Sequence, residues 1–330
     1  MGRRRRRRPS VRLTRSNGLW ERGLWERASL AIFTLLLLAP AHAQDTRTTH
    51  VVDGIYLITG AGGNVTVSVG ESGILVVDTG SPEMSDALLA AIREISDETI
   101  RYVVNTSALA EHTGGNATIR LAGDTFTGGN ATVVGGVDVG AAIVAHENTL
   151  LRLTQLTSLP FDALPTETFF APKLDLYFNA EPVELMYQPN AVDDTNLIVH
   201  FRRSDVISTG DIFRLDSYPV IDLESGGSID GIIAALNGLV DLAVSDTLAE
   251  GGTLIIPGHG RICDEADLVR YRDMVTIIRD RIRTLVGRGR TLDEIKAARP
   301  TLDYDSRFGS TAGPWTTDLF IEAVYRSLGT

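Results

Sequence analysis

A polar stretch at residues 105–116, NTSALAEHTGGN, constrains the fold of this chain most strongly. It follows the apolar run at residues 100–104, which is typical of a buried strand, and it leads into two glycines that can open a helix. Glu111 and His112 are the ionisable residues of this stretch.

Strands and amphipathic helices alternate in both halves of the chain. Alternating and apolar runs predict strands at residues 51–59, 64–70, 73–80, 100–104, 197–201, 205–213 and 252–260. Apolar spacings of three and four predict helices at residues 81–95, 225–243, 266–286, 290–300 and 317–328, the first with Ser81 as its N-cap. This order favours an α+β fold in which two sheets pack face to face with helices outside. The strand ends that carry Glu111, His112, Asp211 and His259 would then meet at one rim.

The first 43 residues have the pattern of a secretory signal peptide. Arginines at residues 3–8 precede a 12-residue apolar core at residues 28–39 and an A-x-A site at residues 41–43. This core is shorter than the roughly 20 residues that span a bilayer. We therefore expect cleavage after Ala43, a periplasmic or secreted protein, and no membrane association of the mature chain.

The mature chain is strongly acidic. Removing residues 1–43 takes away 10 arginines and 2 glutamates, which leaves 21 basic and 40 acidic side chains and a formal charge of −19. Such a surface repels nucleic acid and anionic membranes. We expect a small-molecule substrate as the partner, and no sequence feature fixes an oligomeric state.

Other polar features have structural interpretations. Cys263 is the only cysteine, so no internal disulfide can form, and we expect it to be a small buried residue. His146 and His200 lie in or beside apolar runs and favour packing or hydrogen-bonding roles over metal binding. A second TGGNAT copy at residues 127–132 lies in a glycine-rich segment that is typical of an inserted loop.

Five segments together resemble the metallo-β-lactamase fold hydrolases. They are VVDTG at residues 76–80, the NTSALAEHTGGN stretch, TGDIF at residues 209–213, YPVIDLESGGSIDG at residues 218–231 and PGHG at residues 257–260. The resemblance covers nearly all of residues 44–330. It implies one domain with a four-layer αββα sandwich and C-terminal helices.

The resemblance also implies which metal ligands are kept. The three histidines of the family's first zinc site correspond here to Ser107, Leu109 and Val192, so that site cannot form in the usual way. The second site corresponds to four residues that all remain possible ligands: Glu111, His112, Asp211 and His259. Two imidazoles and two carboxylates suit one zinc ion or a similar divalent metal.

Two hypotheses follow. In the first, a single metal in the second site activates water against an ester-, thioester- or lactam-like substrate, with Glu111 or Asp211 orienting the water or acting as base. In the second, the chain is a catalytically degenerate relative with a binding or structural role, and the four residues hold a structural metal or form an ion cluster without one.

Overall fold

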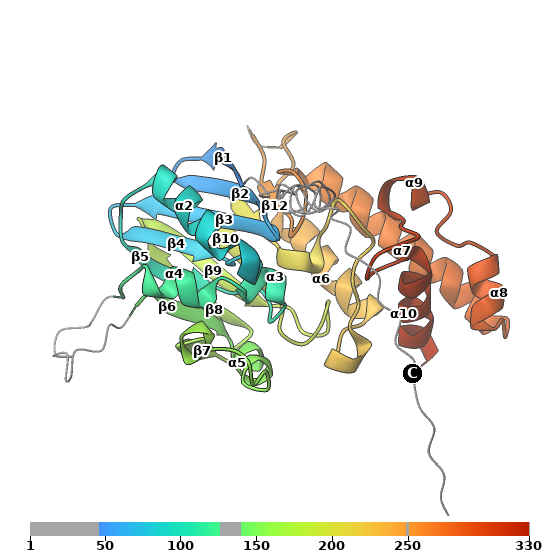
Figure 1. The fold of residues 1–330 in the computed structure, drawn as a ribbon. Helices are drawn as coiled ribbons and strands as arrows, with labels where there is room; N and C mark the ends of the chain where they lie inside the picture. The colour runs from blue at the N-terminus through green and yellow to red at the C-terminus, as the bar shows by residue number, and fades with distance from the viewer. Residues whose placement is uncertain (1–45, 126–139, 249–250, 330) are drawn as a thin grey trace, which may run out of the picture. The chain divides into compact units, whose positions relative to one another are not determined.

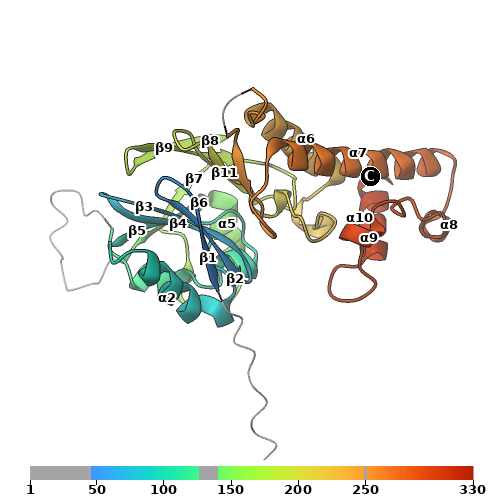
Figure 2. The same ribbon diagram turned by 90° about the horizontal axis from the view of Figure 1, so that it is seen from above.

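The computed structural model describes residues 46–125, 140–248 and 251–329 (Figures 1 and 2), all within one compact unit, residues 44–330. The expected signal peptide and the second TGGNAT copy lie outside the described residues. Among the helices described, none is long and apolar enough to cross a membrane.

The first sheet has seven strands in the order of the sequence (Figure 1). They are β1 (Arg47–Val52), β2 (Ile55–Ala61), β3 (Gly63–Gly70), β4 (Gly73–Val77), β5 (Ile100–Val104), β6 (Ala142–His146) and β7 (Glu167–Phe169). Strands β1 to β4 pair antiparallel and β4 to β7 pair parallel. The prediction of one strand over residues 51–59 was wrong. Asp53 has a φ of 48°, which an aspartate tolerates in a turn, and the turn divides the segment into β1 and β2.

The second sheet has five strands in the order β12-β11-β10-β9-β8. They are β8 (Lys173–Phe178), β9 (Glu181–Tyr187), β10 (Leu197–Phe201), β11 (Val206–Ser208) and β12 (Leu254–Ile256). Two of them end earlier than the sequence predicts, since strands were expected over residues 205–213 and 252–260. After β11, Gly210 has a φ of 51° and the chain turns into the 3-10 helix η3 (Gly210–Ile212). Asp211 is therefore placed in a tight turn beyond the end of the strand.

The structure has the five predicted helices, each beginning within four residues of its expected start, and it adds short helices that the sequence did not predict. Their bounds are η1 (Pro82–Met84), α2 (Ser85–Ile95), α3 (Ala110–Thr113), α4 (Asn116–Leu121), α5 (Glu147–Leu153), η2 (Phe161–Ala163), η4 (Leu223–Ser225), α6 (Ile229–Leu242), α7 (Glu265–Gly287), α8 (Leu292–Ala297), α9 (Asp305–Phe308) and α10 (Thr317–Gly329). The prediction that Ser81 caps α2 was wrong, because a 3-10 turn comes first and the Ser81 side chain makes no capping hydrogen bond. Ser228 does cap α6, since its hydroxyl accepts a hydrogen bond from the Gly231 N–H.

Three hydrophobic clusters show how the layers pack. The cluster between the sheets joins side chains such as Leu75 and Val77 of β4 to Leu185 of β9 and Val199 of β10. A second cluster packs α2 and α4 on the outer face of the first sheet, and a third packs α6, α7 and α10 on the second sheet. The order is therefore helix, sheet, sheet, helix, as expected (Figure 2).

Candidate metal centre

All four predicted ligands lie at one rim of the sandwich. Glu111 and His112 belong to the single helical turn α3 that follows β5 of the first sheet. Asp211 lies in η3 after β11, and His259 follows β12, both in the second sheet. Strands β11 and β12 are parallel neighbours, so their carboxyl ends bring Asp211 and His259 together.

Three buried atoms of this group face one another without a hydrogen-bond partner. The Asp211 Oδ1 atom lies 3.4 Å from His112 Nε2 and 3.6 Å from His259 Nε2. None of the three atoms makes a hydrogen bond to any other described residue. Buried polar atoms are nearly always paired in folded proteins, so this convergence calls for a partner that binds all three.

Glu111 completes the group on its more exposed side. Its Oε2 atom lies 3.3 Å from His259 Nε2, and its side chain is 33% exposed. Ligand atoms of Glu111, His112 and Asp211 all lie within 4.8 Å of one another. Two imidazole nitrogens and two carboxylates are a donor set that zinc accepts, so the residues fit one ion.

Asp78, at the end of β4, fixes the orientation of His112. Its Oδ2 atom lies 2.7 Å from His112 Nδ1 and accepts a 2.6 Å hydrogen bond from the Thr106 hydroxyl, while Oδ1 accepts one of 2.7 Å from the Thr106 N–H. The His112 Nδ1–H group therefore donates to Asp78, which leaves Nε2 facing Asp211. A carboxylate on the far nitrogen of a ligand histidine is the usual support in metal sites.

Asp78 lies in the VVDTG motif, and the sequence alone gave this residue no role. The position of Asp78 could have indicated a role at the site, because this residue directly follows β4, a buried strand that pairs in parallel with β5. The structure adds a backbone signal, since Asp78 has a φ of 65°, a conformation that non-glycine residues adopt only at a cost.

Arg214 is the second residue that the sequence did not reveal. Its Nη1 atom donates a 2.8 Å hydrogen bond to Asp211 Oδ2 and lies 3.5 Å from Glu111 Oε1. On its other side, Nε and Nη2 donate to the two carboxylate oxygens of Asp216 at 3.2 and 3.4 Å. The side chain is only 11% exposed, so this charge is built into the site.

Neighbouring charges shift the pKa values of His112 and Asp211. Burial opposes the charged form of His112, but the Asp78 and Asp211 carboxylates outweigh it and raise the pKa of His112 well above its usual value. Burial would raise the pKa of Asp211, yet His112, Arg214 and His259 hold it far below its ordinary range. Without a metal ion, His112 is therefore a cation between two carboxylates.

The loop that carries His259 is held against the first sheet by Asn64 of β3. The Asn64 side chain donates to the carbonyl oxygens of Pro257 and Gly260, and its N–H donates to Gly258 O, all at 2.8–3.0 Å. Gly258 is needed for the close approach, because a Cβ atom there would lie 2.2 Å from Asp211 Oδ1.

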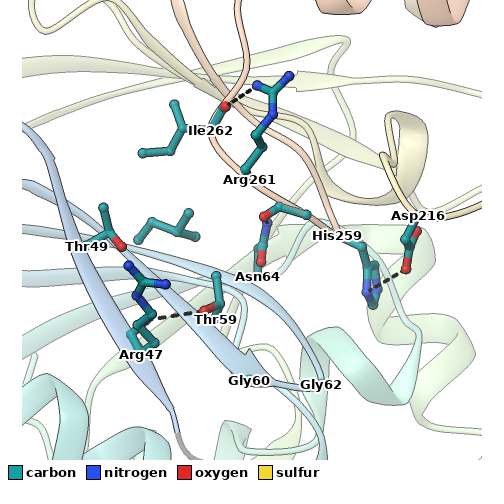
Figure 3. Close-up of a pocket in the computed structure, with 12 residues that line it drawn as sticks. Arg47, Thr49, Thr59, Gly60, Gly62, Asn64, Asp216, His259, Arg261 and Ile262 are labelled. Carbon is teal, nitrogen blue, oxygen red and sulfur yellow. Dashed lines mark hydrogen bonds and ion pairs between the residues drawn. The ribbon is translucent and has the colours of Figure 1, made fainter.

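A cavity of about 620 Å³ opens beside His259 (Figure 3). It lies between β1, β2 and the loop after β12, and its lining includes Arg47, Thr59, Asn64, Asp216 and Arg261. The close-up shows the His259 ring and the Asp216 carboxylate side by side at one end of this cavity. Of the four predicted ligands, His259 alone is among the residues that line this cavity.

Solved structures of known proteins share this architecture. A metallo-β-lactamase from Pontibacter korlensis aligns with a TM-score of 0.54 at 14% identity, over 70% of this chain and 99% of its own. The sec-alkylsulfatase Pisa1 from Pseudomonas sp. aligns with a TM-score of 0.61 at 14% identity, over 85% of this chain and 50% of its own. The DIM-1 metallo-β-lactamase aligns with a TM-score of 0.52 at 19% identity, over 70% of this chain and 97% of its own.

The chain has the metallo-β-lactamase fold. No protein-family sequence model matches it, and no curated protein matches its sequence. At this low identity the solved structures establish the fold, and the chemistry has to be argued from the residues of the site.

The three positions that the resemblance assigned to the first-site histidines are buried or partly buried. Val192 is fully buried in the cluster under α6 and α7, and Leu109 packs against the same cluster. Ser107 is buried, and its hydroxyl accepts a 3.2 Å hydrogen bond from the Leu109 N–H. Leu109 and Val192 therefore have packing roles in this structure.

The remaining polar residues lie where the sequence analysis expected them. His146 ends β6, accepts a hydrogen bond from the Asn148 N–H and stacks on the Tyr187 ring at a centroid distance of 3.7 Å. His200 is buried in β10, 3.9 Å from Glu184 Oε2. Cys263 is buried, and burial raises the pKa of its thiol to about 12, so it remains a neutral packing group.

Proposed function

We propose that this chain is a metal-dependent hydrolase that uses one divalent ion, held by Glu111, His112, Asp211 and His259. The convergence of His112 Nε2, His259 Nε2 and Asp211 Oδ1 without hydrogen-bond partners supports the proposal, because all three atom types are zinc ligands. A bound zinc ion would supply Lewis acidity and activate water against an electrophilic carbonyl.

Asp78, Asp211 and Glu111 have different roles in this proposal. Asp78 keeps the Nδ1–H of His112 engaged, which leaves the other nitrogen for the metal. Asp211 is fully buried and its pKa is held low, so it is a poor proton acceptor and serves as a ligand. Glu111 is one-third exposed and lies at the open side of the centre. We assign to Glu111 the orientation of water and the acceptance of its proton.

The substrate in this proposal is a small molecule with an ester-, thioester- or lactam-like group. It would enter through the cavity beside His259, which is large enough for a compact organic molecule. The acidic character of the chain argues against nucleic acid as the substrate.

A second candidate function is supported by Arg214. Its guanidinium already balances negative charge on the Asp211 and Glu111 carboxylates. The site could therefore persist as a charged cluster without a metal. The protein would then be a catalytically degenerate relative that binds a ligand or has a structural role.

Metal stoichiometry separates the two functions. We expect one equivalent of zinc in the purified protein by elemental analysis, lost in His259→Ala and retained in His200→Ala, which removes a buried histidine outside the centre. Hydrolysis of an ester, thioester or lactam panel should disappear with EDTA and in Glu111→Gln. Absence of metal at saturating zinc would rule out the first function, and activity that survives EDTA would rule out this mechanism.

We also propose export to the periplasm or the exterior, on the basis of the pattern in residues 1–43. Mass spectrometry of the secreted or periplasmic fraction should find a chain that begins at Gln44. A cytoplasmic chain that keeps residues 1–43 would contradict this.

A further inference from the structure

The two carboxylate oxygens of Asp211 have different neighbours. Oδ1 has no hydrogen-bond partner among the described residues and faces the nitrogens of His112 and His259. Oδ2 accepts the 2.8 Å hydrogen bond from Arg214 Nη1. One of the two oxygens of this carboxylate is therefore committed to a guanidinium.

The guanidinium also engages the other carboxylates on that side. Its Nη1 atom lies 3.5 Å from Glu111 Oε1, and its Nε and Nη2 atoms bind both oxygens of Asp216. Arginine stays charged at any pH at which the protein is folded. A second divalent cation near Asp211 Oδ2 would therefore lack free oxygens and would meet a fixed positive charge at close range.

We propose that Arg214 supplies the positive charge that a first-site metal would otherwise provide, and that it limits this centre to one metal ion. This inference rests on the proposed metal site.

Removing the guanidinium should create a site of a different type. Asp211 Oδ2, Glu111 Oε1 and the Asp216 carboxylate would face one another without a cation, and a set of carboxylate oxygens suits a hard ion such as Mn²⁺. We expect zinc to remain on the histidine side, where the ligands are unchanged.

The test is a Mn²⁺ titration of zinc-loaded protein, followed by electron paramagnetic resonance and elemental analysis. The unmodified protein and Arg214→Lys, which keeps the charge, should bind one zinc and no Mn²⁺. Arg214→Gln should bind one zinc and one Mn²⁺. The matched control is Arg120→Gln, because Arg120 is also buried and paired, at 2.8 Å to Asp162, but lies outside the centre; it should behave like the unmodified protein.

A zinc-loaded Arg214→Gln protein that binds no Mn²⁺ would overturn the inference, as would Mn²⁺ binding by the unmodified protein. If Arg214→Gln does not fold, Arg214→Ala provides the second test. Its Mn²⁺ binding should fall as millimolar guanidinium is added, and binding that ignores guanidinium would overturn the inference. Failure of the unmodified protein to take up zinc would instead contradict the proposed function, so the two failures are distinguishable.

Discussion

The role of His112 depends on a single carboxylate. Asp78 accepts from His112 Nδ1, and this contact selects the ring nitrogen that faces the centre. Asp78 is itself held by two hydrogen bonds from Thr106 and adopts a φ of 65°. A conformation that costs energy and is fixed by several contacts is typical of a functional position.

Asp78→Asn should weaken zinc binding by about 10- to 100-fold, the usual effect of losing such a carboxylate. The asparagine can still accept from Thr106, but its amide group no longer stabilises a proton on His112 Nδ1. Competition with a chelating dye would measure the change. Asp194→Asn is the control, because that carboxylate pairs with Arg152 instead of a centre residue. Unaltered affinity in Asp78→Asn would mean that the proton position on His112 is fixed by other contacts.

At the scale of single elements, the loop after β12 lies close against the 3-10 helix η3. Gly258 lies against Asp211, and its N–H donates to the Gly210 and Phe213 carbonyl oxygens at 2.8 and 3.0 Å. The strand therefore ends at Ile256, and the loop continues along η3 to deliver His259. The PGHG motif directly follows an apolar run, so the sequence predicts a strand through this loop, and the structure does not have one there.

Gly258→Ala should lower both zinc affinity and stability. The added methyl group would lie 2.2 Å from Asp211 Oδ1 and 2.8 Å from Gly210 O, so the loop must move. Overpacking of this kind costs about 1–3 kcal/mol in the free energy of unfolding. Urea denaturation and zinc titration would measure the two effects. Gly238→Ala in α6 is the control, since its Cβ meets nothing within 4 Å and should add up to ~1 kcal/mol of stability. Equal behaviour of the two variants would contradict the packing argument.

At the scale of the whole molecule, the centre joins the two sheets. Glu111, His112 and Asp78 come from the first sheet, and Asp211 and His259 come from the second. A metal bound by both groups would link them, so its binding free energy would add to the stability of the fold.

The free energy of unfolding that a bound metal adds should depend on pH. The pKa of His112 is raised in the metal-free fold, so the stability that its charge contributes is complete below its unfolded pKa of about 6.5 and is lost as the pH rises through the folded pKa. Zinc requires the unprotonated Nε2 atom, so zinc stabilisation has the opposite dependence. Below the folded pKa of His112, the gain from zinc should grow by up to ~1.4 kcal/mol per pH unit.

Urea unfolding of zinc-loaded and EDTA-treated protein at several pH values from 6.5 upward would measure this gain. His200→Gln is the control variant and should show the same increase, because His200 lies outside the centre. A gain from zinc that does not change with pH would contradict the assignment of His112 as a protonated group that the metal displaces.

The sequence by itself predicted the fold, and the five segments that resemble the metallo-β-lactamase fold hydrolases named the four candidate ligands. Apolar runs located several strands because a buried face requires them, but they did not predict where β11 and β12 end. The proposed metal roles of Glu111, His112, Asp211 and His259 stay predictions, although the structure brings the four together.

Only the tertiary structure decided which charged side chains contact one another at that rim. Asp78 and Arg214 act through contacts with residues of different strand ends, and Arg214 contacts Glu111 from the other half of the chain. Local sequence patterns report periodicity and turn chemistry, but they carry no information on which side chains of separate segments meet. The guanidinium on one oxygen of Asp211 and the two unpartnered histidine nitrogens near the other exist only because the two sheets pack face to face.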